Sequence, residues 1–208
     1  MIDLATVEGL LIDMDGTLVD SDAAVERTWR DWAVRHSVDP DAVVAACHGA
    51  TAEGTIRRFR PDLDEATVDA QAVAHMRRET QDTDGVVPTP GAHDLIAYLV
   101  AAGLPWAVVT NADLGLARAR LGAGGIVPRL LTTVDEVPVG KPHPAIYRLG
   151  ASRIGVPIER CLAVEDSAAG VGSARAAGAL VAALRRDGGD LRIADLGELT
   201  AALRAARG

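Results

Sequence analysis

The sequence predicts an α/β protein built on a doubly wound parallel sheet, with a helical segment inserted after the first strand. Short apolar runs that end at polar residues recur along the chain, and segments with helical spacing lie between them. The interval 22–82 between the first two runs has helical spacing and little strand character. With 208 residues, the chain is long enough for one such core and a smaller inserted unit.

The individual elements follow from local patterns. An amphipathic helix is expected where Leu95, Ile96, Leu99 and Val100 share one face before the stop at Gly103. Strands are expected at 9–14, 106–109, 161–164 and 179–184, with a weaker candidate at 130–133.

The inserted segment is expected to be an α-helical bundle. Val25, Trp29 and Trp32 follow helical spacing, and the two tryptophans are expected in its core. A return linker rich in glycine and proline occupies 84–91. We therefore expect a core domain of residues 1–20 and 87–208, with a helical domain of residues 21–86 inserted into it.

Composition and charge exclude several classes. Hydrophobic residues make up 49% of the chain and charged residues 24%, which indicates a folded core. The net charge of −8 argues against a nucleic-acid partner. The acidic start of the chain and the lack of an apolar stretch near ~18 residues predict a cytoplasmic protein without a membrane partner. The oligomeric state is not indicated.

The first apolar run ends in an Asp-x-Asp-Gly pattern, formed by Asp13, Asp15 and Gly16. On a strand, spacing i, i+2 would place both carboxylates on one side, and the glycine would let the chain turn sharply. Open α/β sheets bind ligands beyond the carboxyl ends of their strands. Paired carboxylates there can divide the roles of nucleophile and proton donor. Taken alone, the pattern is equally consistent with a turn after a buried strand.

Polar residues also lie at the ends of two other predicted strands and before a predicted helix. Thr110 and Asn111 follow the second strand, Glu165 and Asp166 follow a later strand, and Lys141 precedes a predicted helix start. The Thr110 hydroxyl, the Asn111 backbone N–H and the Lys141 ammonium are suited to bind phosphate. Clustered carboxylates would repel one another without a cation, and oxygen ligands favour Mg²⁺. Each of these positions alone could be a helix cap or a surface residue.

Together these motifs resemble those of the haloacid dehalogenase superfamily. The chain carries them as DMDGT (13–17), VVTNA (108–112), the GKPHP lysine (141) and VEDSAAG (164–170). The resemblance implies a Rossmann-like core with an inserted α-helical cap. It also implies that Asp13 is a nucleophile forming an aspartyl phosphate and that Asp15 is the general acid and base. Asp13, the Asp15 backbone carbonyl and Asp166 would hold Mg²⁺, with Glu165 assisting.

Within this superfamily, the second aspartate, Asp15, favours phosphoryl transfer over dehalogenation. The β-phosphoglucomutase type uses a cap histidine and a cap arginine, whereas the matching positions here are Val25 and Ala52. The cap sequence is instead similar to sugar and glycerol-phosphate phosphatases, and His48 and Gly49 would lie in its substrate loop. We therefore expect a phosphatase acting on small sugar or polyol phosphates. The alternatives are a phosphoglycolate phosphatase, a hexose-phosphate mutase, or an inactive metabolite-binding protein.

Overall fold

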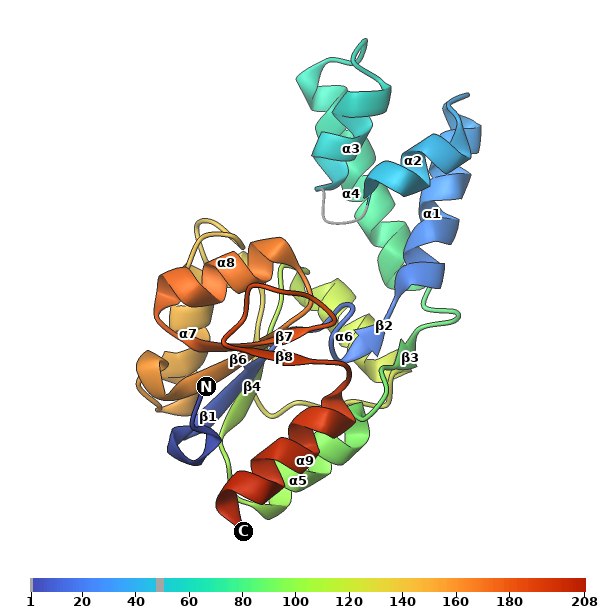
Figure 1. Cartoon of the computed structure of the whole chain (residues 1–208). Helices are drawn as coiled ribbons and strands as arrows, with labels where there is room; N and C mark the ends of the chain where they lie inside the picture. Colours follow the sequence, from blue (N-terminus) through green and yellow to red (C-terminus); the bar gives the residue numbers. More distant parts are fainter. Residues whose placement is uncertain (1, 48–50) are drawn as a thin grey trace. The chain divides into compact units, whose positions relative to one another are not determined.

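The computed structural model describes residues 2–47 and 51–208, and most of its helices and strands are labelled in Figure 1. By their internal contacts, the residues separate into two compact units. One comprises Met1–Asp20 and Val87–Gly208, and we call it the core unit. The other comprises Ser21–Val86, and we call it the helical unit.

The core unit contains a six-stranded sheet in the order β5-β4-β1-β6-β7-β8, in which every neighbouring pair is parallel. The predicted doubly wound sheet is confirmed, and the strand ends differ from the predicted ones by at most two residues. Strand β8 was not predicted. The strands are β1 (Gly9–Ile12), β4 (Trp106–Val109), β5 (Leu131–Thr132), β6 (Cys161–Glu165), β7 (Leu180–Leu184) and β8 (Leu191–Ile193).

The central strands are buried on both faces, which explains their uninterrupted apolar sequences. Leu11 of β1 and Ala163 of β6 are register partners, and they belong to the same buried cluster as Tyr147. Helices α7 (Ala145–Ile154) and α8 (Ala168–Ala177) supply residues to that cluster. Helices α5 (Ala92–Ala101) and α9 (Leu196–Arg207) pack together on the other face of the sheet (Figure 1). The predicted helix before Gly103 is α5.

Two helices begin just beyond the carboxyl ends of strands. Helix α6 (Leu114–Ala123) follows β4, and its cap Asp113 accepts a hydrogen bond from the Leu116 N–H at 2.8 Å. Helix α8 follows β6, and its cap Ser167 accepts one from the Gly170 N–H at 3.0 Å. These starts fix the two loops that carry predicted site residues. The 3-10 helices are Leu4–Thr6, Val134–Glu136 and Ile158–Arg160.

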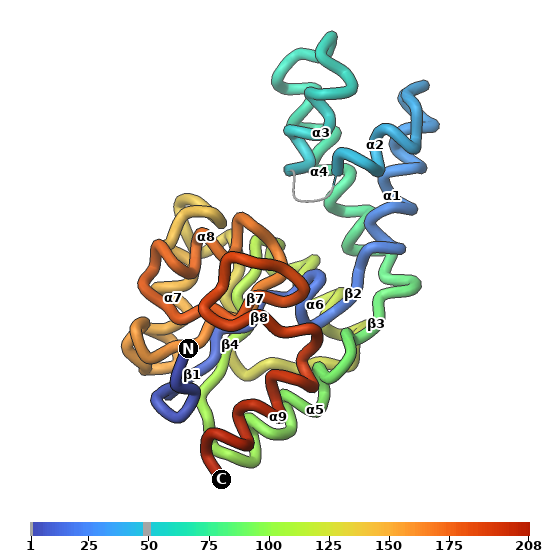
Figure 2. The backbone as a smooth tube through the Cα atoms, in the orientation of Figure 1, coloured from blue at the N-terminus to red at the C-terminus, as the bar shows by residue number. Residues whose placement is uncertain are grey.

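The chain leaves and re-enters the core unit through two short strands that run side by side in Figure 2. Strands β2 (Val19–Asp20) and β3 (Val87–Pro88) pair antiparallel. They were not predicted, because two residues are too few to establish a strand periodicity.

The helical unit contains α1 (Asp22–Arg35), α2 (Pro40–Cys47), α3 (Ala52–Phe59) and α4 (Glu65–Gln81). Trp29 and Trp32 are buried in its hydrophobic cluster, as predicted. Trp29 also lies against the buried ring of His75, with 3.8 Å between ring centroids. The cap residues His48 and Gly49 lie outside the described residues.

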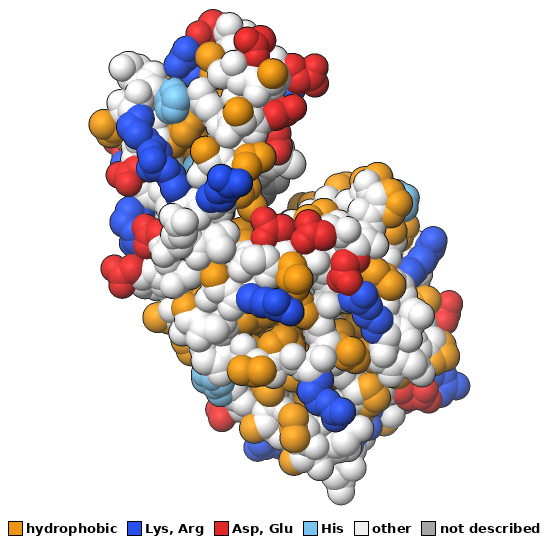
Figure 3. Space-filling view, turned by 180° about the vertical axis from the view of Figure 1, so that it is seen from behind, with side chains coloured by type: hydrophobic (Ala, Val, Ile, Leu, Met, Phe, Trp, Pro, Cys, Tyr) orange, Lys and Arg blue, Asp and Glu red, His pale blue; other side chains and the backbone are white. Residues whose placement is uncertain are grey.

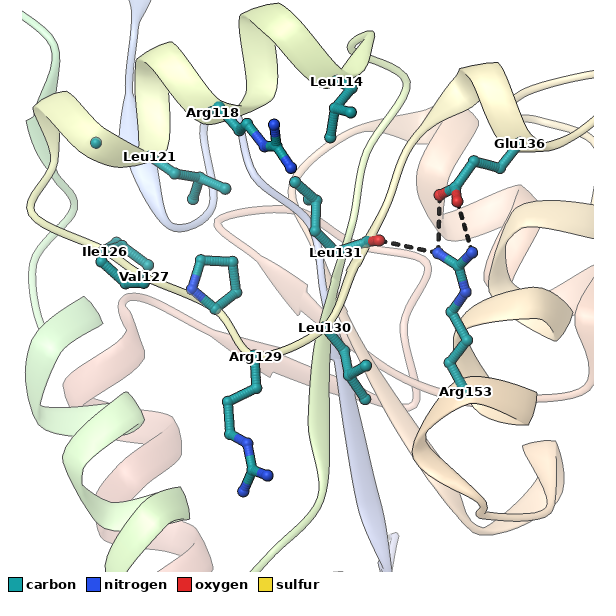
Figure 4. Close-up of a pocket in the computed structure, with 12 residues that line it drawn as sticks. Leu114, Arg118, Leu121, Ile126, Val127, Arg129, Leu130, Leu131, Glu136 and Arg153 are labelled. Carbon is teal, nitrogen blue, oxygen red and sulfur yellow. Dashed lines mark hydrogen bonds and ion pairs between the residues drawn. The ribbon is translucent and has the colours of Figure 1, made fainter.

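The surface of the described residues shows how charge is distributed and where a pocket lies. On the face shown in Figure 3, basic and acidic side chains are interspersed rather than gathered into one basic patch. A pocket of about 720 Å³ lies beside the edge strand β5, where Arg153 pairs with Glu136 and donates to the Leu131 carbonyl (Figure 4). No helix among the described residues has the length and hydropathy that crossing a membrane requires.

Candidate active site

Asp13 lies directly after β1 and is largely buried. Its N–H donates to the Val164 carbonyl at 3.0 Å, which continues the pairing of β1 with β6 by one residue. The chain then turns at Gly16, where φ is +73° and an added Cβ would lie 2.1 Å from Asp166 Oδ2. Only glycine therefore fits this turn, because it tolerates the left-handed backbone and leaves room for the Asp166 carboxylate.

Asp15 lies in the turn rather than on the strand. Because β1 ends at Ile12, the alternation expected for a strand does not extend to the two aspartates. The Asp15 side chain forms an ion pair with Arg120 of α6, with Oδ1 and Nη1 3.0 Å apart. The Arg120 side chain is only 6% exposed, so this cation is buried beside the predicted acid and base. Arg120 was not among the predicted site residues, although an arginine between the apolar Leu116 and Leu121 was a possible signal.

Lys141 lies with its ammonium group between two carboxylates. Its Nζ is 2.5 Å from Asp13 Oδ1 and 2.6 Å from Glu165 Oε1, and it donates to the Val109 carbonyl at 2.9 Å. An ammonium has three hydrogens, so these contacts use them all. Burial lowers the pKa of Lys141, but Asp13 and Glu165 outweigh that effect and the pKa is raised above its usual value. The lysine is therefore charged.

The surroundings of Asp13 shift its pKa in opposite directions. Burial raises its pKa well above the usual range and the Glu165 charge adds to the rise, whereas Lys141 opposes both. Asp166 is half-buried and accepts a hydrogen bond from Thr17 Oγ1 at 3.4 Å. Burial and Glu165 raise its pKa to about 6. A cation placed among these acids would relieve the repulsion that raises both pKa values.

Three carboxylates lie close together where such a cation would bind. Asp13, Glu165 and Asp166 each offer a carboxylate oxygen, and these atoms lie within 4.8 Å of one another. A ligand set of oxygens suits a hard divalent cation such as Mg²⁺. Asp166 is also held through its main chain, because Arg186 Nη1 donates to its carbonyl at 2.8 Å. The donor set therefore fits a magnesium site.

Glu165 is fully buried, and protein donors surround its carboxylate. Oε1 accepts from Lys141 Nζ and from the Tyr147 hydroxyl, each at 2.6 Å. Oε2 accepts from Ser167 N–H at 3.3 Å and from Ser167 Oγ at 3.1 Å. Burial raises the pKa of Tyr147 well above its usual value, with Glu165 adding to the rise, so the phenol keeps its proton. Tyr147 was not among the predicted site residues.

The loop after β4 holds the predicted phosphate-binding residues. Thr110 Oγ1 accepts from the Ala112 N–H at 3.0 Å, which leaves its hydroxyl proton to donate elsewhere. The Asn111 side chain instead binds the Lys141 backbone: Oδ1 accepts from its N–H at 2.8 Å, and Nδ2 donates to its carbonyl at 3.1 Å. An added Cβ at Gly140 would lie 2.5 Å from Asn111 Oδ1, so this approach also requires glycine.

Comparison with known proteins places this site in a family. The model of the haloacid dehalogenase-like hydrolases matches residues 7–178. The chain belongs to this family. Hexitol phosphatase A of Escherichia coli (strain K12) is 42% identical over 178 residues, which cover 85% of this chain and 82% of the relative. Glycerol-1-phosphate phosphohydrolase 1 of Saccharomyces cerevisiae is 30% identical over 83% of this chain and 72% of the relative.

A solved structure agrees with this haloacid dehalogenase-like assignment. The structure of CbbY from Rhodobacter sphaeroides in complex with phosphate matches with a TM-score of 0.78 and 26% identity. The match covers 93% of this chain and 96% of that chain. The resemblance inferred from the four motifs is thereby confirmed, and the chain is a hydrolase of this family.

Proposed function

We propose that this haloacid dehalogenase-like hydrolase is a Mg²⁺-dependent phosphatase of small sugar or polyol phosphates. The observation that carries the proposal is the buried contact between Lys141 and Asp13, at the carboxyl ends of the strands and beside Asp166. The similarity to hexitol phosphatase A and to glycerol-1-phosphate phosphohydrolase 1 supports the substrate class. The two buried free thiols, Cys47 and Cys161, support the cytoplasmic location expected from the sequence.

In this proposal, Asp13 is the nucleophile. Its carboxylate oxygen forms a bond to phosphorus while the bond from phosphorus to the ester oxygen breaks, giving an aspartyl phosphate. A phosphoryl oxygen takes the place of Asp13 Oδ1 on one Lys141 hydrogen, while Val109 and Glu165 hold the other two. The Thr110 hydroxyl and the Asn111 backbone N–H donate to the remaining phosphoryl oxygens. Asp13, Asp166 and the Asp15 carbonyl would hold Mg²⁺, which when bound would supply positive charge to the phosphoryl oxygens.

Asp15 transfers the protons. It donates one to the departing alkoxide, which leaves as the alcohol, and the resulting carboxylate takes one from the water that then attacks phosphorus. Cleavage of the bond between phosphorus and Asp13 releases inorganic phosphate and restores both carboxyl groups. The ion pair with Arg120 is not itself the geometry of proton transfer, because Asp15 has to leave Arg120 and carry a proton before it can donate one.

A phosphate-release panel tests the function. Hexitol, hexose and glycerol phosphates are expected to be hydrolysed well ahead of nucleotides, with Asp13→Asn purified in parallel to exclude a contaminating phosphatase. β-Glucose 1-phosphate with a trace of the 1,6-bisphosphate distinguishes the mutase. Accumulation of glucose 6-phosphate ahead of free phosphate would replace the phosphatase assignment with a mutase. No product of either kind would favour a binding protein.

We also propose that residues 21–86 are the cap domain expected from the sequence.

A further inference from the structure

All the lone pairs of the Glu165 carboxylate are used by hydrogen bonds, so none is left to bind a metal ion. A carboxylate offers about four lone-pair sites. Lys141 and Tyr147 occupy those of Oε1, while the Ser167 N–H and hydroxyl occupy those of Oε2. A cation bound by Glu165 would therefore have to displace at least one of these donors.

The packing around Glu165 also prevents the carboxylate from turning toward a cation. The side chain is fully buried, and the start of α8 lies directly against it. An added Cβ at Gly170 would lie 1.8 Å from Oε1 and 2.1 Å from Oε2. The backbone of α8 therefore closes one side of the carboxylate, and rotation would break the contacts to Lys141 and Tyr147 together.

Tyr147 contacts both members of the Lys141–Glu165 pair. Its hydroxyl donates to Glu165 Oε1 at 2.6 Å, and Lys141 Nζ lies 5.2 Å from the centroid of its ring. The Tyr147 side chain is fully buried between α7 and the sheet, where the cluster containing Leu11 and Ala163 fixes it. A rigid phenol thus fixes the direction of the carboxylate oxygen that receives the lysine ammonium.

We propose that Tyr147 and Glu165 are positioning residues for Lys141, and that Glu165 is not a ligand of the metal. The proposal rests on the proposed function, in which Lys141 binds the transferring phosphoryl group. Tyr147 directs Glu165 Oε1, Oε1 holds one ammonium hydrogen, and the remaining hydrogens point toward the Val109 carbonyl and the phosphoryl group. Metal binding is left to Asp13, Asp166 and the Asp15 carbonyl.

The test is Tyr147→Phe, which removes the hydroxyl and keeps the ring. Loss of a residue that orients a group at the site is expected to lower kcat about 10-fold, within the range seen for such supporting contacts. Tyr98→Phe is the matched control, because Tyr98 is the other tyrosine of the chain and packs under Arg204 on α5 and α9. It is expected to keep wild-type kcat. Thermal melting of both variants shows whether each one is folded.

Measuring metal binding without substrate distinguishes a positioning role for Glu165 from a role as a metal ligand. Free Mn²⁺, counted by its electron paramagnetic resonance signal during titration, gives a dissociation constant that does not depend on turnover. In Tyr147→Phe, this constant is expected to stay within about 2-fold of wild type, whereas loss of an orienting contact to a metal ligand costs about 10- to 100-fold in affinity. Asp166→Asn is the positive control, because it is expected to weaken Mn²⁺ binding strongly.

A double-mutant cycle with Lys141→Ala tests whether Tyr147 acts through the lysine. With p-nitrophenyl phosphate as substrate, Tyr147→Phe is expected to have little further effect in the Lys141→Ala background, since residues that act as a unit are not additive. The proposal is overturned by weakened Mn²⁺ binding in Tyr147→Phe, by unchanged kcat, or by full additivity. The Mn²⁺ titration uses no substrate. If no substrate of the panel were hydrolysed, the proposed function would be refuted, but the Mn²⁺ dissociation constants would still show whether Glu165 is a metal ligand.

Discussion

Substitution of two glycines in α8 gives a matched test of the packing around Glu165. Gly170→Ala places a Cβ 1.8 Å from Glu165 Oε1, whereas the Cβ of Gly172→Ala meets no atom within 4 Å. Alanine normally stabilises a helix interior by about 1 kcal/mol relative to glycine, and that gain applies to both variants. The two substitutions should therefore have effects of opposite sign on stability.

The loss in Gly170→Ala follows from the contacts that the methyl group would break. Forcing an extra methyl into a packed site costs about 1–3 kcal/mol, and each lost hydrogen bond to a charged group costs about 1.5–3 kcal/mol. Displacing the Glu165 carboxylate breaks its bonds to Lys141 and Tyr147. After subtraction of the helix gain, these contributions leave a net loss of about 3–8 kcal/mol, and we expect a value near the lower end, about 4 kcal/mol.

Thermal unfolding followed by far-ultraviolet circular dichroism measures both variants. For a chain of this size, a loss of that magnitude lowers Tm by about 8–16 °C, and Gly172→Ala should raise Tm by about 2–4 °C. Gly170→Ala should also lose most of its phosphatase activity, because Lys141 loses its Glu165 partner. A Tm for Gly170→Ala equal to that of Gly172→Ala would refute the packing described for Glu165.

Two further predictions concern the chemistry. Asp15→Asn should lower kcat by about 10²- to 10⁴-fold for alkyl phosphates, whose leaving groups need a proton, and far less for p-nitrophenyl phosphate; equal losses on both would contradict the acid role. The pKa of Asp166 is raised to about 6, so below this pH protons compete with Mg²⁺ for its carboxylate. The affinity for Mg²⁺ should therefore decrease roughly tenfold for each pH unit below about 6. The same raised pKa means that, in the metal-free protein, this group stabilises the fold more as pH falls from about 6 to about 4. Affinity that stays constant from pH 5 to 8 would contradict the Asp166 assignment.

The sequence was sufficient to predict the core strands, because a buried parallel strand requires an uninterrupted apolar run that ends at the sheet edge. It also placed Asp13, Thr110, Lys141 and Asp166 at strand ends and a helix start, where the structure has them. Strand β8 could not be predicted in the same way, because three residues with a charged Arg192 at the centre carry no clear alternation.

Side-chain partners were harder to predict than elements. The pairing of Arg120 with Asp15 joins α6 to the turn after β1, and the bond from Tyr147 to Glu165 joins α7 to β6. Such contacts depend on how elements pack in three dimensions, which spacing along the chain does not encode. Asn111 shows the same limit: the sequence predicted a backbone contact to phosphate, and its side chain holds the Lys141 backbone.

Borohydride reduction measures whether Asp13 carries the phosphoryl group during turnover. Borohydride reduces an acyl phosphate to the alcohol, so a reaction quenched during turnover and then reduced should contain homoserine in place of Asp13. Peptide mass analysis should find this change only when substrate and Mg²⁺ are present, and never in Asp13→Asn. Homoserine at another position, or no modification in an enzyme trapped at full turnover, would contradict the mechanism.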